Sequence, residues 1–179
     1  CPVPNWCANH IEITGPEEKI QKIYMDSQNG LLETLAPLGE WEYNDALNGW
    51  GTKWEVDSTG LAVDLSMNDG TATLSGYFES AWSPPVQALE TFEFKNPDCE
   101  VKLHYYEPSM DFCGSLDENI TISDVKKDYF LTDPLGIELD GHFDVVGMID
   151  DYYEIEQEEA LDTPPDVLEE PKGLEETKY

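Results

Sequence analysis

Residues 9–18 read NHIEITGPEE, and this stretch decides the fold. Ile11 and Ile13 alternate with polar neighbours, which predicts a half-buried strand over residues 9–14. A proline and two glutamates follow, and they favour a helix start, because proline suits the first helical turn and acids stabilise the positive end of the helix dipole. Apolar side chains at helical spacing then predict a helix over residues 16–29.

The same two periods return further along the chain. Leu61, Val63 and Leu65 alternate with polar residues, and an Asn-Asp-Gly turn at residues 68–70 predicts a hairpin. Further strands are expected over 54–66, 71–80 and 99–107. A second helix is expected over 84–92, with Ser83 as its N-cap, whereas 31–43 is interpreted as an irregular connection. This β-α-β-β-α-β order predicts an α+β fold with one antiparallel sheet and both helices on one face.

The pattern weakens beyond Gly114. It predicts a short strand over 119–123, a short helix over 124–131, and strands over 143–149 and 152–155 that extend the sheet or cover its open face. Prolines and acidic residues dominate residues 156–179, which is typical of a disordered tail. We therefore expect one α+β domain over residues 1–155, with an extension after residue 114, followed by an acidic tail over 156–179.

Acidic residues outnumber basic ones by 39 to 9, for a net charge of −30, and every basic residue is Lys. Twelve acids and two lysines lie in residues 150–179, so the body before them is acidic in its own right. Because phosphates are bound by Lys and Arg, we expect no direct binding of nucleic acid. This charge attracts basic surfaces, although a solubility or salt adaptation explains it equally well. No apolar run approaches the length of a membrane span.

The cysteines lack the two-residue spacing typical of zinc or cluster sites; they are Cys1, Cys7, Cys99 and Cys113. We interpret them as buried, reduced thiols and expect no bound metal or cofactor. A site that joins Cys7 and Cys113 to His10 or His104 is the alternative. Cys1 could also be a lipid-modified first residue, but a trimmed N-terminus is the simpler interpretation.

Sequence motifs of catalysis are missing. The chain has no phosphate-binding Gly-Lys-Ser/Thr loop and no His-Glu-x-x-His pair. We interpret His10, His104 and His142 as scattered, without the nucleophile or orienting partner that base catalysis needs. Glu79 and Glu107 could face each other across the sheet, but solvated strand positions explain them as well. We therefore expect no catalytic residues.

Aromatic signatures in the first two-thirds of the chain resemble one family. They are residues 4–9 (PNWCAN), 50–54 (WGTKW), 78–85 (FESAWSPP) and 105–108 (YYEP). In this order they resemble the YubB ferredoxin-like family, whose members are carried by bacteriophages and conjugative plasmids, and residues 150–155 are similar to its closing strand. The resemblance covers about residues 4–155. It implies a ferredoxin-like βαββαβ sandwich without an iron–sulfur cluster, and no established activity.

Charge and resemblance together favour a non-catalytic accessory protein in the cytoplasm of a host cell. We expect it to bind a host protein with a basic surface. In the sharpest form of this hypothesis it is a DNA mimic that inhibits a host defence or DNA-binding factor, with carboxylates in place of phosphates. Candidate carboxylates on the acidic surface are Asp57, Asp64 and Asp69.

The alternative function is a small-molecule-binding or enzymatic module built around Lys53. Apolar walls with a few polar groups are typical of ligand sites. The aromatic residues expected around this lysine are Trp6, Trp50, Trp54 and Trp82. Local packing of the same tryptophans is the plainer interpretation.

Overall fold

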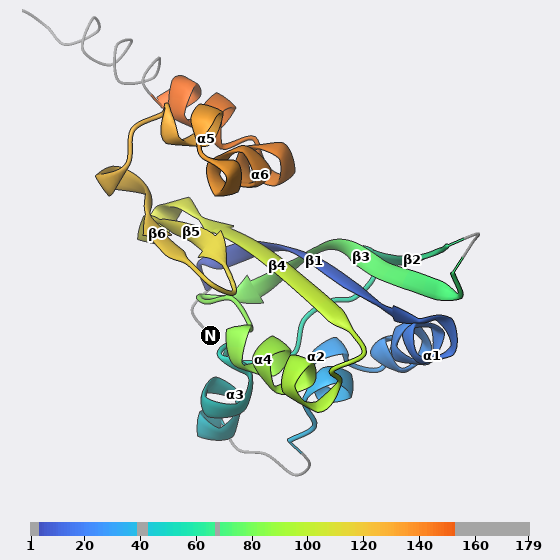
Figure 1. The fold of residues 1–179 in the computed structure, drawn as a ribbon. Helices are drawn as coiled ribbons and strands as arrows, with labels where there is room; N and C mark the ends of the chain where they lie inside the picture. The colour runs from blue at the N-terminus through green and yellow to red at the C-terminus, as the bar shows by residue number, and fades with distance from the viewer. Residues whose placement is uncertain (1–3, 39–42, 67–68, 153–179) are drawn as a thin grey trace, which may run out of the picture.

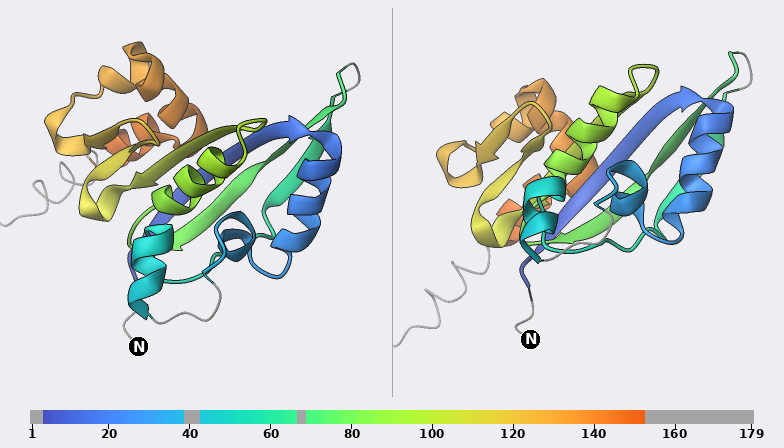
Figure 2. Two further views of the ribbon diagram at one scale, coloured as in Figure 1. Left: turned by 60° about the horizontal axis from the view of Figure 1, so that its bottom comes forward. Right: turned by 90° about the horizontal axis from the view of Figure 1, so that it is seen from below.

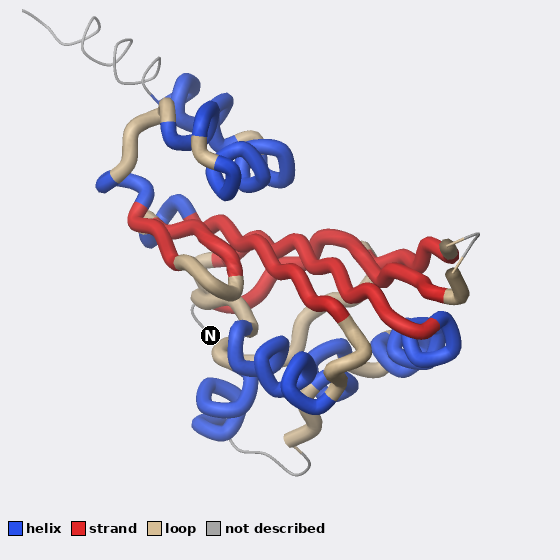
Figure 3. The backbone as a smooth tube through the Cα atoms, viewed as in Figure 1, coloured by secondary structure: helices blue, strands red, loops and turns tan. Residues whose placement is uncertain are grey.

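The computed structural model describes residues 4–38, 43–66 and 69–152. An antiparallel sheet forms its centre, with the strands in the order β2-β3-β1-β4-β5-β6 (Figure 1, Figure 3). Helices pack on the sheet, so the α+β class is confirmed. The strands are β1 (Trp6–Pro16), β2 (Leu61–Leu65), β3 (Thr71–Ala81), β4 (Glu100–Glu107), β5 (Phe112–Ser115) and β6 (Asn119–Thr121).

Strand β1 is central, because it pairs with β3 along its whole length and with β4 over residues 8–14. Its side chains alternate between the two faces of the sheet. Ile11 and Ile13 are completely buried on one face, and each such burial contributes about 1.5–3 kcal/mol. His10 and Glu12 take the alternate positions and therefore face the other side.

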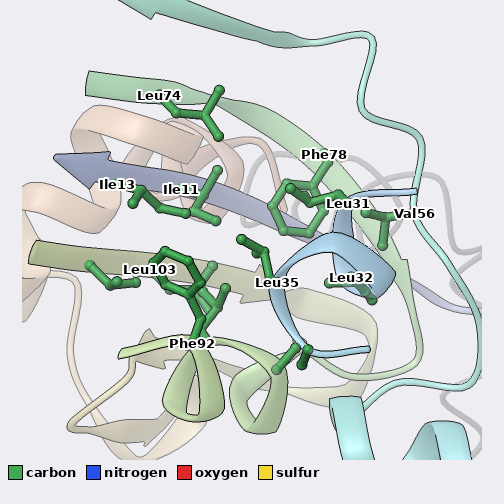
Figure 4. Close-up of a cluster of buried hydrophobic side chains, with 14 of the residues drawn as sticks. Ile11, Ile13, Leu31, Leu32, Leu35, Val56, Leu74, Phe78, Phe92 and Leu103 are labelled. Atoms are coloured by element: carbon green, nitrogen blue, oxygen red, sulfur yellow. The ribbon is translucent and has the colours of Figure 1, made fainter. Parts of the chain in front are cut away.

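One face of the sheet, called the lower face from its place in Figure 1, carries α1 (Glu17–Ser27), α2 (Leu31–Leu35), α3 (Tyr43–Trp50) and α4 (Val86–Lys95). Figure 2 shows the same layer from two further directions. The main core fills the space between these helices and the sheet, where Leu35 and Phe92 point toward Ile11 and Leu103 (Figure 4). The two helices expected from the sequence therefore lie on one face.

The opposite, upper face is covered at one end by α5 (Tyr129–Thr132) and α6 (Pro134–Phe143), followed by a helical segment over 145–152. The single-turn helices η1 (Pro108–Met110) and η2 (Ile122–Asp124) flank β5 and β6. A second core lies here, with Phe130 and Leu139 packed near Tyr106. No helix in the described part of the chain is long and apolar enough to cross a membrane.

The strand predicted over 143–149 is wrong, because this stretch is helical apart from Asp144. Asp144 has a φ of 53° and ends α6. The carboxylate of Asp140 accepts a hydrogen bond from the backbone N–H of Val146 at 2.9 Å, which starts the next helical segment. Val145 is fully buried in the second core, so tertiary packing overrides its β-propensity. Residues 150–152 are also helical, and 153–179 lie outside the described residues.

Three smaller expectations also change. The strand expected over 54–66 spans only Leu61–Leu65, whose pairing with β3 begins at Leu61. Gly60, just before it, lies too close to the Tyr77 carbonyl to carry a side chain. The connection over 31–43 contains helix α2. Ser83 does not cap α4, which begins at Val86; its hydroxyl donates to the Gly51 carbonyl.

Candidate functional site

Three imidazoles meet on the upper face of the sheet. Tyr77, His10 and His104 occupy opposite positions on β3, β1 and β4 and form one row across these strands. His142 of α6 lies over the row, and its ring centroid is 4.0 Å from that of His10 and 5.0 Å from that of His104. We call His10, His104 and His142 the histidine cluster. The prediction that they are scattered is wrong, because strand pairing and the return of α6 join distant parts of the chain.

Helix α6 provides two side chains to this site. The Glu138 carboxylate lies 2.8 Å from Nε2 of His104, and His142, four residues later, lies on the same side of the helix. The Tyr77 hydroxyl is 3.5 Å from Nδ1 of His142. Nδ1 of His10 is buried and has no hydrogen-bond partner among the described residues. Ring stacking and two side-chain hydrogen bonds, His104 with Glu138 and Tyr77 with His142, therefore join α6 to the sheet.

The surroundings of His10 and His142 favour their neutral forms. Burial, with His10 and His104 close by, lowers the pKa of His142 to about 4, although Glu12 and Glu138 oppose the shift. Burial also lowers the pKa of His10. Neutral imidazoles are common metal ligands. Among the described residues, however, no group of three His, Cys, Asp or Glu side chains is arranged to hold a metal ion. The absence of a bound metal stays a prediction.

A second feature is an open groove of about 470 Å³ beside β3. Strand β2 pairs with β3 only as far as Gly76, and beyond this point residues 54–60 run along β3 instead. Trp6 and Trp54 form one wall, with ring centroids 6.4 Å apart and planes at 74°. We call this feature the aromatic groove, and it is lined by Trp6, Trp54, Glu55, Val56, Asp57, Thr59, Gly60, Tyr77, Phe78 and Glu79.

The three carboxylates of the aromatic groove differ in their roles. Glu55 accepts hydrogen bonds from the backbone N–H groups of Leu32 and Glu33, at 2.8 and 2.9 Å, and so caps α2. Hydrogen bonds within its own turn lower the pKa of Asp57. The side chain of Glu79 is exposed, and its carboxylate makes no hydrogen bond or ion pair with any other described residue. No lining residue is basic, so the groove is negatively charged.

The predicted tryptophan pocket is divided between three places. Trp6 and Trp54 line the aromatic groove. Trp82 packs against Trp54, with centroids 5.5 Å apart, and the ammonium of Lys53 lies 3.7 Å from the Trp82 ring centre. Trp50 is buried, and its indole N–H donates to a backbone carbonyl at 2.8 Å. Lys53 and Trp82 therefore lie behind the groove wall, and Trp50 belongs to the core.

The three predicted carboxylates, Asp57, Asp64 and Asp69, are all exposed. They lie before, on and after the edge strand β2, respectively. Asp64 lies on β2 itself, where a charge discourages pairing with another strand. Asp69 accepts hydrogen bonds from the backbone N–H and the hydroxyl of Thr71, at 3.1 and 2.7 Å. Two of the three therefore also stabilise turns.

Two pairs that the sequence analysis left as alternative sites are separated by the sheet. Cys7 belongs to the main core, whereas Cys113 belongs to the second core on the other face. Burial raises the pKa of both thiols to about 12. Glu79 is on the upper face, but Glu107 has the opposite strand parity, is 2% exposed, and accepts a hydrogen bond from the backbone N–H of Met110 at 2.7 Å. Neither pair can form one site.

Sequence periodicity contains a partial signal for the histidine cluster. His10 and His104 both fall on outward positions of expected strands, which places them on one face if the strands are neighbours. The sequence pattern did not predict the register between β1 and β4 or the position of His142, because both depend on contacts between distant residues. For the aromatic groove, the tryptophan signatures indicated two wall residues, Trp6 and Trp54. The position of the groove beside β3 had no sequence signal, since residues 54–60 form no regular element.

Comparisons of the chain with models of protein families, with curated proteins and with solved structures found no match. The resemblance to the YubB ferredoxin-like family therefore stays a hypothesis that rests on the aromatic signatures.

Proposed function

We propose that this chain is a non-catalytic binding protein that recognises a partner protein with a basic surface. The observation that carries the proposal is the net charge of −30. Its own lysines compensate little of this charge, and several are already engaged with neighbouring carboxylates. Ion pairs in the described part of the chain are Lys19–Asp98, Lys22–Asp26, Lys102–Glu100 and Lys127–Asp150.

The sharpest form of the proposal is DNA mimicry. Carboxylates along an exposed face attract a groove that has evolved to hold phosphates, and they steer association over long range. The partner is then a nuclease, restriction enzyme or other DNA-binding factor of the host. Asp57, Asp64 and Asp69 contribute to this face because all three are exposed and lie before, on and after the edge strand β2.

We also propose a ferredoxin-like topology and membership of the YubB family. The order β2-β3-β1-β4, with α1 and α4 on one face, supports this assignment. Helices α2 and α3, and the layer formed by α5 and α6, are then additions to the common unit. The mobile-element context of that family favours a role in the cytoplasm of a host cell.

A second candidate, binding of a small molecule, is favoured by one observation. The aromatic groove, at about 470 Å³, lies within the size range of known ligand sites, about 300–1,000 Å³. An enzymatic version of this candidate gains no support from the groove, because its only unengaged carboxylate is Glu79.

The test is affinity capture from a bacterial lysate at low and physiological salt, followed by affinity measurement with the captured protein. Association should be fast at low salt and should weaken steeply as salt rises. Neutralisation of Asp57, Asp64 and Asp69 to Asn keeps the turn-forming oxygens and should weaken binding. Deletion of residues 156–179 should weaken it only in part. A partner whose binding ignores salt and these changes, yet is abolished by Trp6→Ala, would refute the proposal.

A further inference from the structure

We propose that the aromatic groove binds the positively charged end of a Lys or Arg side chain presented by the protein partner. This inference rests on the proposed function, because it assigns a specific recognition point to a surface otherwise described only by its charge. Three observations carry it: the arrangement of the tryptophans, the state of Glu79, and the charge of the lining residues.

The tryptophans form a continuous row of ring contacts. Trp6 contacts Trp54 edge to face, and Trp54 contacts Trp82 in the same way. Cations bind to the faces of Trp rings more strongly than to those of Tyr or Phe. The chain already uses this interaction at one end of the row, where the Lys53 ammonium lies over Trp82. At the other end Trp6 is 43% exposed, so an external cation can reach the row from the groove.

The carboxylates decide between a cation and a neutral ligand. An apolar ligand would cover Glu79 and Asp57 and remove them from water without replacing their hydrogen bonds, which is costly. A guanidinium or ammonium group donates hydrogen bonds to these carboxylates while its face or stem packs on the indoles. An anion would meet uncompensated negative charge. Only a cation satisfies both the aromatic wall and the acidic rim.

The shape of the aromatic groove favours a side chain over a free ion. The groove is a trough open to solvent, bounded by the exposed Trp6 and by Tyr77, which is 49% exposed. Its volume of about 470 Å³ accommodates a long side chain that enters from a backbone outside. The backbone and neighbouring basic residues of the partner then contact the surrounding acidic surface.

The probe is a nine-residue Gly/Ser peptide with three spaced arginines, compared with a peptide in which citrulline replaces each arginine. Citrulline keeps the shape and removes the charge. Binding is followed by ¹H–¹⁵N NMR of the tryptophan indole N–H signals at about 0.15 M salt, where charges are screened beyond about 8 Å. The arginine peptide should shift the Trp6 and Trp54 signals. The Trp50 signal is an internal control, because this ring is buried.

The variants are Trp6→Leu and Glu79→Gln, with Glu90→Gln as matched control. Glu90 is an exposed residue of α4, on the other side of the sheet, so its loss removes the same charge away from the groove. Each groove variant should weaken arginine-peptide binding about threefold, as expected for an exposed cation–π contact or ion pair. The control should change binding less than 1.5-fold, roughly the effect expected for distant screened charges.

The other outcomes separate the two proposals. If Glu79→Gln and Glu90→Gln weaken binding equally and the Trp6 and Trp54 signals stay unchanged, the groove inference fails but binding through general acidity survives. If neither peptide binds, the groove inference fails, and the proposed function is decided separately by the salt dependence of binding to the captured partner. Equal binding of the citrulline peptide overturns the cation requirement. Butylguanidinium that binds as tightly as the peptide would assign the groove to a free small cation instead of a protein side chain.

Discussion

The variant His142→Phe should lose less stability than the wild-type protein when the pH is lowered from 7.5 to 5. Phe preserves a ring over His10, whose centroid lies 4.0 Å from that of His142, and removes the ionisable group. The pKa of His142 falls from an ordinary 6.5 to about 4 in the folded protein. Between these values the unfolded chain binds more protons, so the free energy of unfolding falls as the pH falls. Above pH 6.5, where His142 is neutral in both states, its titration costs the folded protein no stability. The free energy of unfolding then falls progressively as the pH drops toward 4.

The expected magnitude follows from this shift. For one site with these two pKa values, linkage predicts a loss of about 2 kcal/mol at pH 5 relative to pH 7.5. His142 is only partly buried, so solvent screening reduces the expected loss to about 1 kcal/mol. The ionisable groups that shift the pKa of His142 are the other two imidazoles of the histidine cluster, Glu12 of β1 and Glu138 of its own helix. The two glutamates offset part of the cost of protonation.

The assay is urea unfolding followed by circular dichroism at pH 7.5 and pH 5 for wild type and His142→Phe. The many carboxylates titrate alike in both proteins, so the difference between the two pH dependences isolates the imidazole. Tyr77→Phe is a matched control, since it changes the same site without removing a group that titrates in this range. Equal pH dependence in wild type and His142→Phe, or an NMR titration of His142 near pH 6.5, would contradict the reasoning.

Three further predictions concern capping, thiols and nucleic acid. Glu55→Ala should lower the free energy of unfolding by about 1–2 kcal/mol, because α2 loses its cap, and an unchanged urea midpoint would count against this role. In a Cys1→Ser/Cys99→Ser background, Cys7 and Cys113 should react with a disulfide reagent at pH 8 only after unfolding, because both are buried with a pKa near 12. Reaction of the folded protein at the rate of a free thiol would show that this packing is wrong. Duplex DNA should not bind at about 0.15 M salt, and a micromolar mobility shift would argue against the acidic-surface proposal.

Local periodicity determined most elements up to residue 107. The alternation of Ile11 and Ile13 specifies β1, because a period of two buries one face of a strand, and the Gly-Pro-Glu-Glu that follows starts α1 through local backbone and dipole effects. The hairpin between β2 and β3 likewise follows from its turn residues. These signals act within a few residues, so the sequence alone contains them. Net charge is also a property of the sequence, and it directs the proposal toward a basic partner.

Tertiary structure alone decided the candidate sites and the upper layer. The helical state of residues 145–152 depends on burial of Val145 in the second core, which outweighs the local preference of a Val-rich segment for strand. The histidine cluster needs the register of β1 against β4 and the return of α6, and the aromatic groove needs an irregular segment to pass β3 where β2 has ended. Each depends on contacts between residues far apart in the chain. Such contacts arise from packing and strand register, which leave no short-range pattern in the sequence.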